Sequence, residues 1–300
     1  PQLNGGTLMS SIARPRNPPI RLRYLIVTAL AVLAVVAGIA RPMVADSAPK
    51  LSATDRIKTN PPPTLFTDAQ ITTIERPVAA QNTRARALMA SWWKAHGSVR
   101  DDKAFLTWVE NQVPAPPSPA VRADELKAVQ ALDKQRTPAG IAAATWLEAN
   151  GKKDIWKLYG HDQRELESKA DGNVDKKDVK LILNLAKTAA DALGAKYQQS
   201  APYVLDPALR TDHSVPKGAV CPCSYPSRHA ARAAGSRTYL GALAPRRLAD
   251  YQWMEGQVTY SRLYMAGHVQ SDITAGSLLG DMIGQYVLVS RGRAPIPAAS

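Results

Sequence analysis

The sequence predicts an all-α fold, and three observations support this class. No alternation of apolar and polar residues persists over the length of a strand anywhere in the chain. Proline-rich breaks such as Pro114–Pro119 separate segments with helical periodicity. One of these segments, Asp175–Tyr197, has a buried face at helical spacing, formed by Val179, Leu181, Ile182, Leu185 and Ala186. With 300 residues and 45% hydrophobic content, the chain can bury one good-sized core behind an N-terminal extension.

Residues 1–23 are a basic segment that we expect to be cytoplasmic, with residues 1–8 lying before the natural start at Met9. Its arginines precede the apolar run Tyr24–Ala40, which is near the short limit of a membrane span and longer than the apolar part of a usual signal peptide. The positive charge would keep the preceding residues inside. We therefore expect residues 24–40 to be a signal anchor or a signal peptide, and the remainder to be exported.

An extended linker is expected at residues 41–66, because the segment is rich in proline, serine, alanine and threonine and ends in three consecutive prolines. A helical domain follows at 67–292 and a short tail at 293–300. Trp92 and Trp93 are expected to pack in the core. The predicted helices are Asp68–His96, Asp101–Val113, Ala120–Lys134, Pro138–Asn150, Asp154–Tyr159, Asp175–Tyr197, Ser227–Leu243 and Asp272–Val289.

The proline-rich segment Tyr203–Cys223 is expected to be a loop over the site. Export would favour a disulfide between its two cysteines, Cys221 and Cys223, whereas closure over Cys-Pro-Cys makes a small strained ring. The sequence leaves this question open.

The formal net charge of +13 suits anionic substrates or an anionic membrane surface. The basic residues are spread along the chain, and the sequence contains no zinc-ligand spacing, recognition-helix signature or aromatic-basic RNA motif. We therefore exclude nucleic acid as the expected partner. Nothing in the sequence sets the oligomeric state.

An arginine, a histidine and an aspartate have a spacing suited to phosphate chemistry. His268 and Asp272 are four residues apart and would share one face of a helix, so the carboxylate can orient the imidazole as a nucleophile or base. Arg262 offers a forked donor for phosphate oxygens. Ser227 and His229 lie upstream, where the start of a helix could hold an anion.

At these residues the chain resembles the superfamily of type 2 phosphatidic acid phosphatases and vanadium haloperoxidases, and is most similar to its soluble class A acid phosphatases. The family has three blocks: Lys-x6-Arg-Pro, Pro-Ser-Gly-His and Ser-Arg-x5-His-x3-Asp. The third block is matched in full by Ser261, Arg262, His268 and Asp272. The resemblance spans about Lys180 to Val289.

The other two blocks depart from the family pattern. Pro226, Ser227 and His229 match the second block, but Arg228 replaces its glycine. In the first block, Lys196 lies two residues too close to the proline and Ala201 replaces the arginine. Losing one preorganised donor typically lowers a rate about 100-fold to 1000-fold. We expect a weak enzyme unless the Arg228 guanidinium folds over the site and compensates.

The resemblance implies an all-α bundle of the acid phosphatase and haloperoxidase type and a two-step phosphoryl transfer. His268 would attack phosphorus, Asp272 would hold its tautomer, and His229 would serve the leaving oxygen and then water. Arg262, Ser227, Arg228 and Lys196 would bind the phosphate, and the chemistry requires neither metal nor cofactor. The expected substrate is a phosphomonoester or a lipid-linked phosphate or diphosphate.

Three alternatives remain open. A vanadium haloperoxidase would bind vanadate through His268, although the arginine missing at Ala201 argues against it. A non-catalytic relative would retain only an anion pocket. An envelope protein would use its N-terminal helices as the functional surface.

Overall fold

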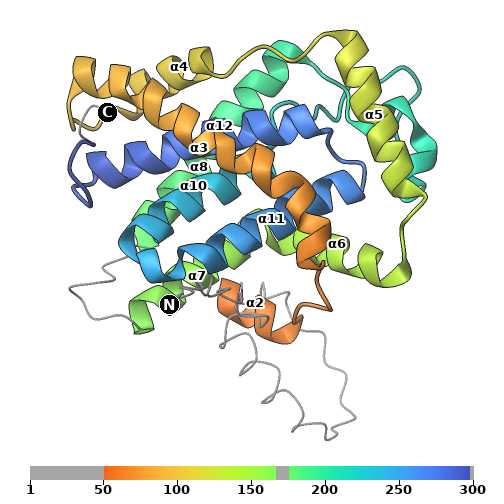
Figure 1. The fold of residues 1–300 in the computed structure, drawn as a ribbon, viewed down its shortest axis with the longest axis horizontal. Coiled ribbons are helices and arrows are strands. Elements are labelled where there is room, and N and C mark those ends of the chain that lie inside the picture. The colour runs from red at the N-terminus through yellow and green to blue at the C-terminus, as the bar shows by residue number, and fades with distance from the viewer. Residues whose placement is uncertain (1–50, 167–175, 298–300) are drawn as a thin grey trace, which may run out of the picture. The chain divides into compact units, whose positions relative to one another are not determined.

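Two helices, α10 (Arg228–Leu243) and α12 (Gln270–Ser290), form the centre of the computed structural model, which describes residues 51–166 and 176–297 (Figure 1). The described residues all fall in one compact unit. The other α-helices are α2 (Ala53–Thr59), α3 (Asp68–His96), α4 (Asp102–Gln112), α5 (Pro119–Asp133), α6 (Pro138–Asn150), α7 (Asp154–Leu166), α8 (Lys176–Tyr197), α9 (Pro202–Leu205) and α11 (Leu248–Tyr264), with short 3-10 helices η2 (Pro207–Arg210) and η3 (Pro245–Arg247).

The all-α prediction is confirmed. Within the described ranges no strand forms, and Ser200 and Cys223 meet only in an isolated antiparallel bridge. Several helices begin where a serine or threonine caps them: Thr67 precedes α3, Thr137 precedes α6 and Ser227 precedes α10. These side-chain oxygens accept hydrogen bonds from amides that have no partner inside the helix, which is why these starts could be predicted.

Small residues let α10 and α12 approach to backbone contact. A Cβ added to Gly276 would lie 2.3 Å from the carbonyl oxygen of Ser227, and one added to Gly280 would lie 2.1 Å from that of Ala231. Gly284, one further turn along α12, faces Gly235 in the same way. Any side chain at these positions would push the helices apart. The two helices are therefore held at a fixed register, with their N-terminal ends side by side.

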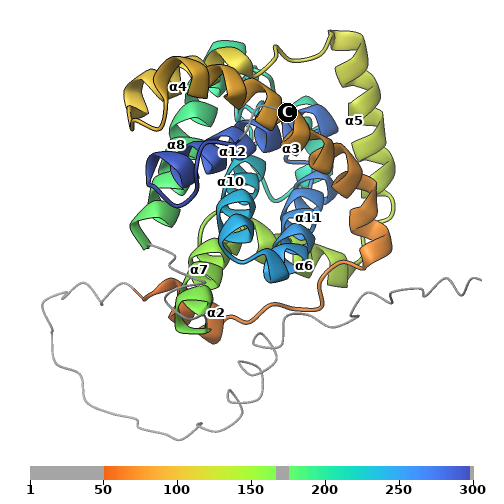
Figure 2. The same ribbon diagram turned by 60° about the vertical axis from the view of Figure 1, so that its left-hand side comes forward.

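The surrounding helices cover this pair on several sides (Figure 2). Helices α3 and α8 pack against α12, α11 packs against α10, and α6 packs against α11. The predicted core role of Trp92 and Trp93 is confirmed, because both are buried. Trp92 packs edge-to-face on Phe105, which in turn stacks on Tyr286 of α12. This aromatic cluster lies far along α12 from its first turn, where the site is found.

The linker predicted at residues 41–66 is partly wrong. Ala53–Thr59 forms α2, which Ser52 caps and which packs against α7. Ile57 is buried, and Arg56 forms an ion pair with Asp154 at 2.6 Å. The flanking prolines hid this short helix, whose formation depends on contacts with α7 rather than on its own propensity.

Two further segments differ from expectation. The helix predicted to end at Tyr159 continues to Leu166 as α7. The segment Tyr203–Cys223, predicted as a loop, begins with the last residues of α9, and η2 follows. The apolar run Tyr24–Ala40 lies outside the described residues. In the part of the chain that is described, no helix has both the length and the apolar character needed to cross a membrane.

Candidate functional site

His268 lies in the turn before α12, and Asp272 lies in the first turn of that helix. His268 therefore precedes the helix, as in the predicted helix Asp272–Val289, and the expected shared helical face does not form. The two residues are still neighbours: His268 Nδ1 is 3.7 Å from Asp272 Oδ2. His268 Nδ1 is also 2.9 Å from the Ser224 carbonyl oxygen. A carbonyl can only accept, so Nδ1 carries the proton and Nε2 of the neutral ring has a free lone pair.

Burial is the main reason that the pKa of His268 is lowered, and Arg262 lowers it further, while Asp272 opposes both. The imidazole is therefore neutral near pH 7 and available as a nucleophile at Nε2.

Asp272 is fully buried and held at three points. Its Oδ1 accepts a hydrogen bond from Arg122 Nη1 at 2.8 Å, its Oδ2 accepts one from the Val269 amide at 3.0 Å, and its carbonyl accepts one from the Ser227 amide at 2.8 Å. Burial raises its pKa, but His268 and Arg122 together outweigh burial and lower it. Asp272 is therefore a fixed carboxylate that orients His268.

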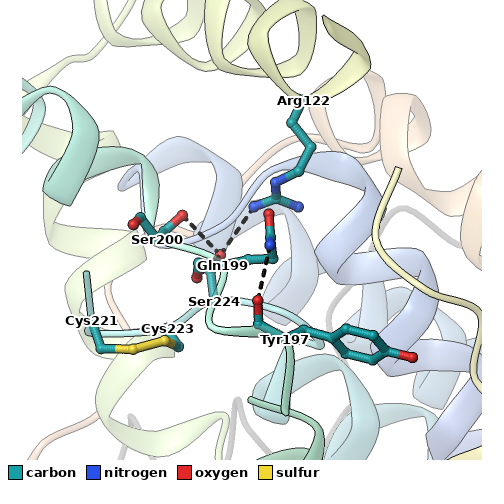
Figure 3. Close-up of a disulfide and its surroundings, with 7 residues drawn as sticks. All are labelled: Arg122, Tyr197, Gln199, Ser200, Cys221, Cys223 and Ser224. Carbon is teal, nitrogen blue, oxygen red and sulfur yellow. Dashed lines mark hydrogen bonds between the residues drawn. A yellow bond between two sulfur atoms is a disulfide. The ribbon is translucent and has the colours of Figure 1, made fainter. Parts of the chain in front are cut away.

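The carbonyl that orients His268 belongs to a braced loop (Figure 3). Cys221 and Cys223 form a disulfide just before Ser224, which answers the question that the sequence left open. The Ser224 amide donates to the Gln199 carbonyl at 2.8 Å, and Arg122 Nη2 lies 3.4 Å from Ser224 Oγ. Arg122 of α5 thus supports both groups that contact His268 Nδ1.

His229 is buried in the first turn of α10. Its Nε2 is 3.1 Å from the Glu148 carbonyl oxygen, so Nε2 carries the proton in the neutral ring. Burial lowers its pKa well below the usual range, and the nearby Arg262 and His268 lower it further. Ser227 lies directly before this turn, where its Oγ caps the helix by accepting from the Ala230 amide at 3.3 Å.

Arg262, in the last turn of α11, is buried beside the two histidines. Its Nη1 is 2.9 Å from Glu148 Oε1. Nη1 is thus paired with this carboxylate, whereas Nε has no hydrogen-bond acceptor among the described residues. A Cβ at Gly267 would lie 2.3 Å from Arg262 Nη2, so glycine is required there for the guanidinium to keep its place.

Two charged residues of the site were missed by sequence reasoning. Arg210 of η2 is only 5% exposed, and its Nη1 lies 3.6 Å from Glu148 Oε2. Asp212 holds the other side of this guanidinium at 2.8 Å, and His213 Nε2 lies 3.2 Å from its Nη2. Neither Arg210 nor Glu148 belongs to a recognisable local motif, so only the fold could reveal them.

Two predicted phosphate ligands lie elsewhere. Arg228 forms an ion pair with Asp191 of α8 at 3.0 Å and is 45% exposed, so the hypothesis that it folds over the site is not supported. Lys196 is exposed at the end of α8 and lies over the ring of Tyr197. At Ala201, where the first-block arginine was expected, the side chain is buried and apolar. Any second cation of the site must therefore come from another element.

The structure brings together His229, Arg262, His268 and Asp272, with Ser227 at the adjoining helix start. Arg262 lowers the pKa of both histidines. Its guanidinium contacts the side chain of Glu148, the residue whose carbonyl accepts the hydrogen bond from His229 Nε2. Over the described ranges no group of His, Cys, Asp and Glu side chains is arranged to hold a metal ion. No family model matches the chain, and no curated protein matches it either.

Proposed function

We propose that this chain hydrolyses phosphate esters through a phosphohistidine, in a helical bundle of the acid phosphatase and haloperoxidase type. One observation carries the proposal: two buried neutral imidazoles lie with a buried guanidinium whose Nε has no acceptor among the described residues. Buried donors are normally satisfied, so such a guanidinium is suited to an anionic ligand. The full match of Ser261, Arg262, His268 and Asp272 to the third family block points to the same chemistry.

In the first step His268 Nε2 attacks phosphorus, and the bond from phosphorus to the leaving oxygen breaks. His229 gives a proton to that oxygen, and the phosphoryl group remains on His268. Arg262 would stabilise charge on the equatorial oxygens. A bound phosphate dianion offsets the charge of Arg262, which raises the pKa of His229 and lets it hold the proton this step needs.

In the second step water attacks phosphorus while His229 takes its proton. The bond between His268 and phosphorus breaks, inorganic phosphate leaves, and His268 returns to the neutral form. Asp272 keeps the same orienting contact throughout. Having given up its proton in the first step, His229 is a neutral imidazole that can accept one from water.

The proposed substrate is a phosphomonoester or a lipid-linked phosphate or diphosphate, since the chain carries a net charge of +13. Residues 24–40 would export the domain and anchor it at the membrane if they are not cleaved. No cofactor is required. We expect weak turnover because Ala201 and Arg228 leave the site with fewer phosphate donors than the family pattern.

The test is turnover of p-nitrophenyl phosphate by the wild-type protein and by His268→Ala, with Arg86→Ala as control because Arg86 is exposed on α3. We expect His268→Ala to abolish hydrolysis and Arg86→Ala to leave it unchanged. Brief incubation with labelled substrate should leave acid-labile phosphate on the wild-type protein alone. Hydrolysis that survives His268→Ala would refute the nucleophile assignment.

A second candidate function is binding of an anion without catalysis. It is favoured by the positions of Ala201, Arg228 and Lys196, none of which supplies a phosphate donor at the site, so the stabilisation of charge that turnover requires is reduced. A wild-type protein that binds phosphate, yet turns over no phosphomonoester above background, would establish this candidate instead.

A further inference from the structure

The Glu148 carboxylate bridges the two buried guanidiniums of the site. Its Oε1 is 2.9 Å from Arg262 Nη1, and its Oε2 is 3.6 Å from Arg210 Nη1. The two arginines come from different elements, α11 and η2. Their side chains are 7% and 5% exposed, whereas that of Glu148 is 30% exposed. The bridging group is therefore the part of this trio that borders solvent.

A carboxylate between two guanidiniums has the charge and the acceptor geometry of part of a phosphate group. Burial raises the pKa of Glu148, but Arg262 and Arg210 together lower it, so the group is ionised near neutral pH. Because Arg262 Nε has no acceptor among the described residues, one carboxylate does not use the full binding capacity of this pair.

The Glu148 side chain can turn away from the two arginines without changing the positions of His229 and Arg210. Its backbone lies in α6, and its carbonyl remains the acceptor for His229 Nε2 whichever way the side chain points. Arg210 keeps the bidentate contact with Asp212 when Glu148 departs, and its position is also fixed by the Met265 carbonyl at 3.2 Å. The arginines would thus stay in place for another anion.

We propose that the Glu148 carboxylate occupies the phosphate position and is a competitor of phosphate there, and that Arg210 supplies the second guanidinium that is absent at Ala201. This inference rests on the proposed function. A ligand must displace a carboxylate that two arginines hold, so the site discriminates by charge. It selects dianionic phosphomonoesters over phosphodiesters and carboxylates, which carry a single negative charge.

The experiment is calorimetric titration of the full chain with inorganic phosphate. Glu148→Gln keeps the shape of the side chain and removes the repelling charge, and we expect it to bind phosphate about tenfold tighter or more. The matched control is Glu165→Gln, the same substitution at a 63% exposed position of α7, where the carboxylate pairs with His161. We expect that change to alter affinity by less than about threefold, because exposed charges interact weakly.

Thermal unfolding gives a second readout that does not depend on turnover. Phosphate should raise the melting temperature of Glu148→Gln more than that of the wild type at equal concentration, because a tighter ligand stabilises the folded state more. If Glu148→Gln proves too unstable to purify, Glu148→Asp is the alternative. Its shorter side chain cannot reach both guanidiniums, and we expect it to bind phosphate tighter than the wild type by a smaller factor.

The outcomes separate this inference from the proposed function. If the wild type binds phosphate and Glu148→Gln binds it no tighter, Glu148 is not a competitor, and the catalytic proposal is untouched. A Glu165→Gln variant that gains as much affinity as Glu148→Gln would also overturn the inference, because the effect would then be one of general charge. If none of the proteins binds phosphate, the anion site itself is absent and both proposals fall.

Discussion

Two buried polar clusters draw residues from α10 and α11, and the two are built in opposite ways. The closed cluster consists of Arg237 of α10, Glu255 of α11 and Asp281 of α12. Arg237 Nε is 2.8 Å from Glu255 Oε2, and its Nη2 is 2.7 Å from Asp281 Oδ1. Its Nη1 contacts Thr238, so every nitrogen of this guanidinium has a partner.

The open cluster consists of His229, Arg262 and His268. Its guanidinium is as deeply buried as that of Arg237, yet its Nε has no acceptor among the described residues. Its counter-ion, Glu148, comes from outside the three helices and borders solvent. A guanidinium whose nitrogens are all paired holds helices in place, whereas a buried donor without an acceptor can receive a ligand. We therefore interpret the closed cluster, near the middle of the three helices, as structural, and the open cluster as the part that carries the proposed chemistry.

The largest effect is expected at the closed cluster. Replacing Arg237 by methionine leaves two buried carboxylates without their cation and should lower the free energy of unfolding by about 3–5 kcal/mol. Urea denaturation measures this loss. As a control from the same helix, Arg228→Ala removes a 45% exposed guanidinium and should cost no more than about 1 kcal/mol. Equal losses in the two variants would remove the basis of the comparison.

Next in size is the effect of Arg262→Lys at the open cluster. Lysine keeps the charge but loses the fork, and we expect kcat/KM for p-nitrophenyl phosphate to fall about 100-fold to 1000-fold, or about 2.7–4 kcal/mol. Its unfolding free energy should change less than that of Arg237→Met, because Arg262 makes fewer hydrogen bonds. A variant that unfolds readily but retains wild-type turnover when folded would reverse the assigned roles.

The contact between α10 and α12 links the two clusters, and Gly280→Ala tests it. Because the new Cβ would meet the Ala231 carbonyl oxygen at 2.1 Å, we expect a loss of about 1–3 kcal/mol in urea denaturation. Gly194→Ala in α8 is the matched control, since its Cβ would meet nothing closer than 3.8 Å. The control should be neutral or stabilised by up to about 1 kcal/mol. Similar behaviour of the two alanine variants would contradict the tight contact.

A smaller effect is expected from pH. His229 has a lowered pKa in the folded protein, so below the usual histidine value of 6.5 the unfolded state takes up a proton that the folded state does not. The contribution of His229 to the free energy of unfolding is therefore present above pH 6.5. It decreases as the pH falls below that value, by at most about 1.4 kcal/mol per pH unit.

The measurement compares urea denaturation of the wild type and His229→Gln between pH 7.5 and pH 5.5. Asp281, whose pKa burial raises, titrates in the same range with the opposite sign, so only the difference between the two proteins reports on His229. Parallel pH profiles would show that this imidazole is not held neutral by the fold.

The smallest effect is expected for Arg228→Gly, which restores the residue of the second family block. Because Arg228 pairs with Asp191 away from the histidines, turnover of p-nitrophenyl phosphate should stay within about twofold of the wild type. A large loss would mean that the Arg228 side chain enters the site when substrate binds.

Much of the fold and some of the residues of the site could be predicted from the sequence. Helical periodicity and capping residues are local signals, and they located α3, α6 and α10 to within a residue or two. Ser261, Arg262, His268 and Asp272 have a fixed spacing and were found as one block. The short helix α2 was missed because its stability comes from packing against α7.

The charges around the open cluster could not be predicted. Glu148 lies near the end of an ordinary alanine-rich helix, and Arg210 lies in a proline-rich segment with no motif of its own. Arg122 supports Asp272 from α5, far away along the chain. Their importance depends on burial and on partners that only the tertiary arrangement supplies. For the same reason, Arg228 and Lys196 had suitable chemistry in the sequence but lie outside the site.

The glycines along α12 also fix the register between α10 and α12. A slide of α10 by one residue would displace His229 by about 1.5 Å relative to His268, enough to spoil the alignment for in-line attack. Contacts between a glycine and a backbone carbonyl, two and three turns away from the site, thus set the distance between the two imidazoles. Substitutions there would slow turnover without touching any group that meets the substrate.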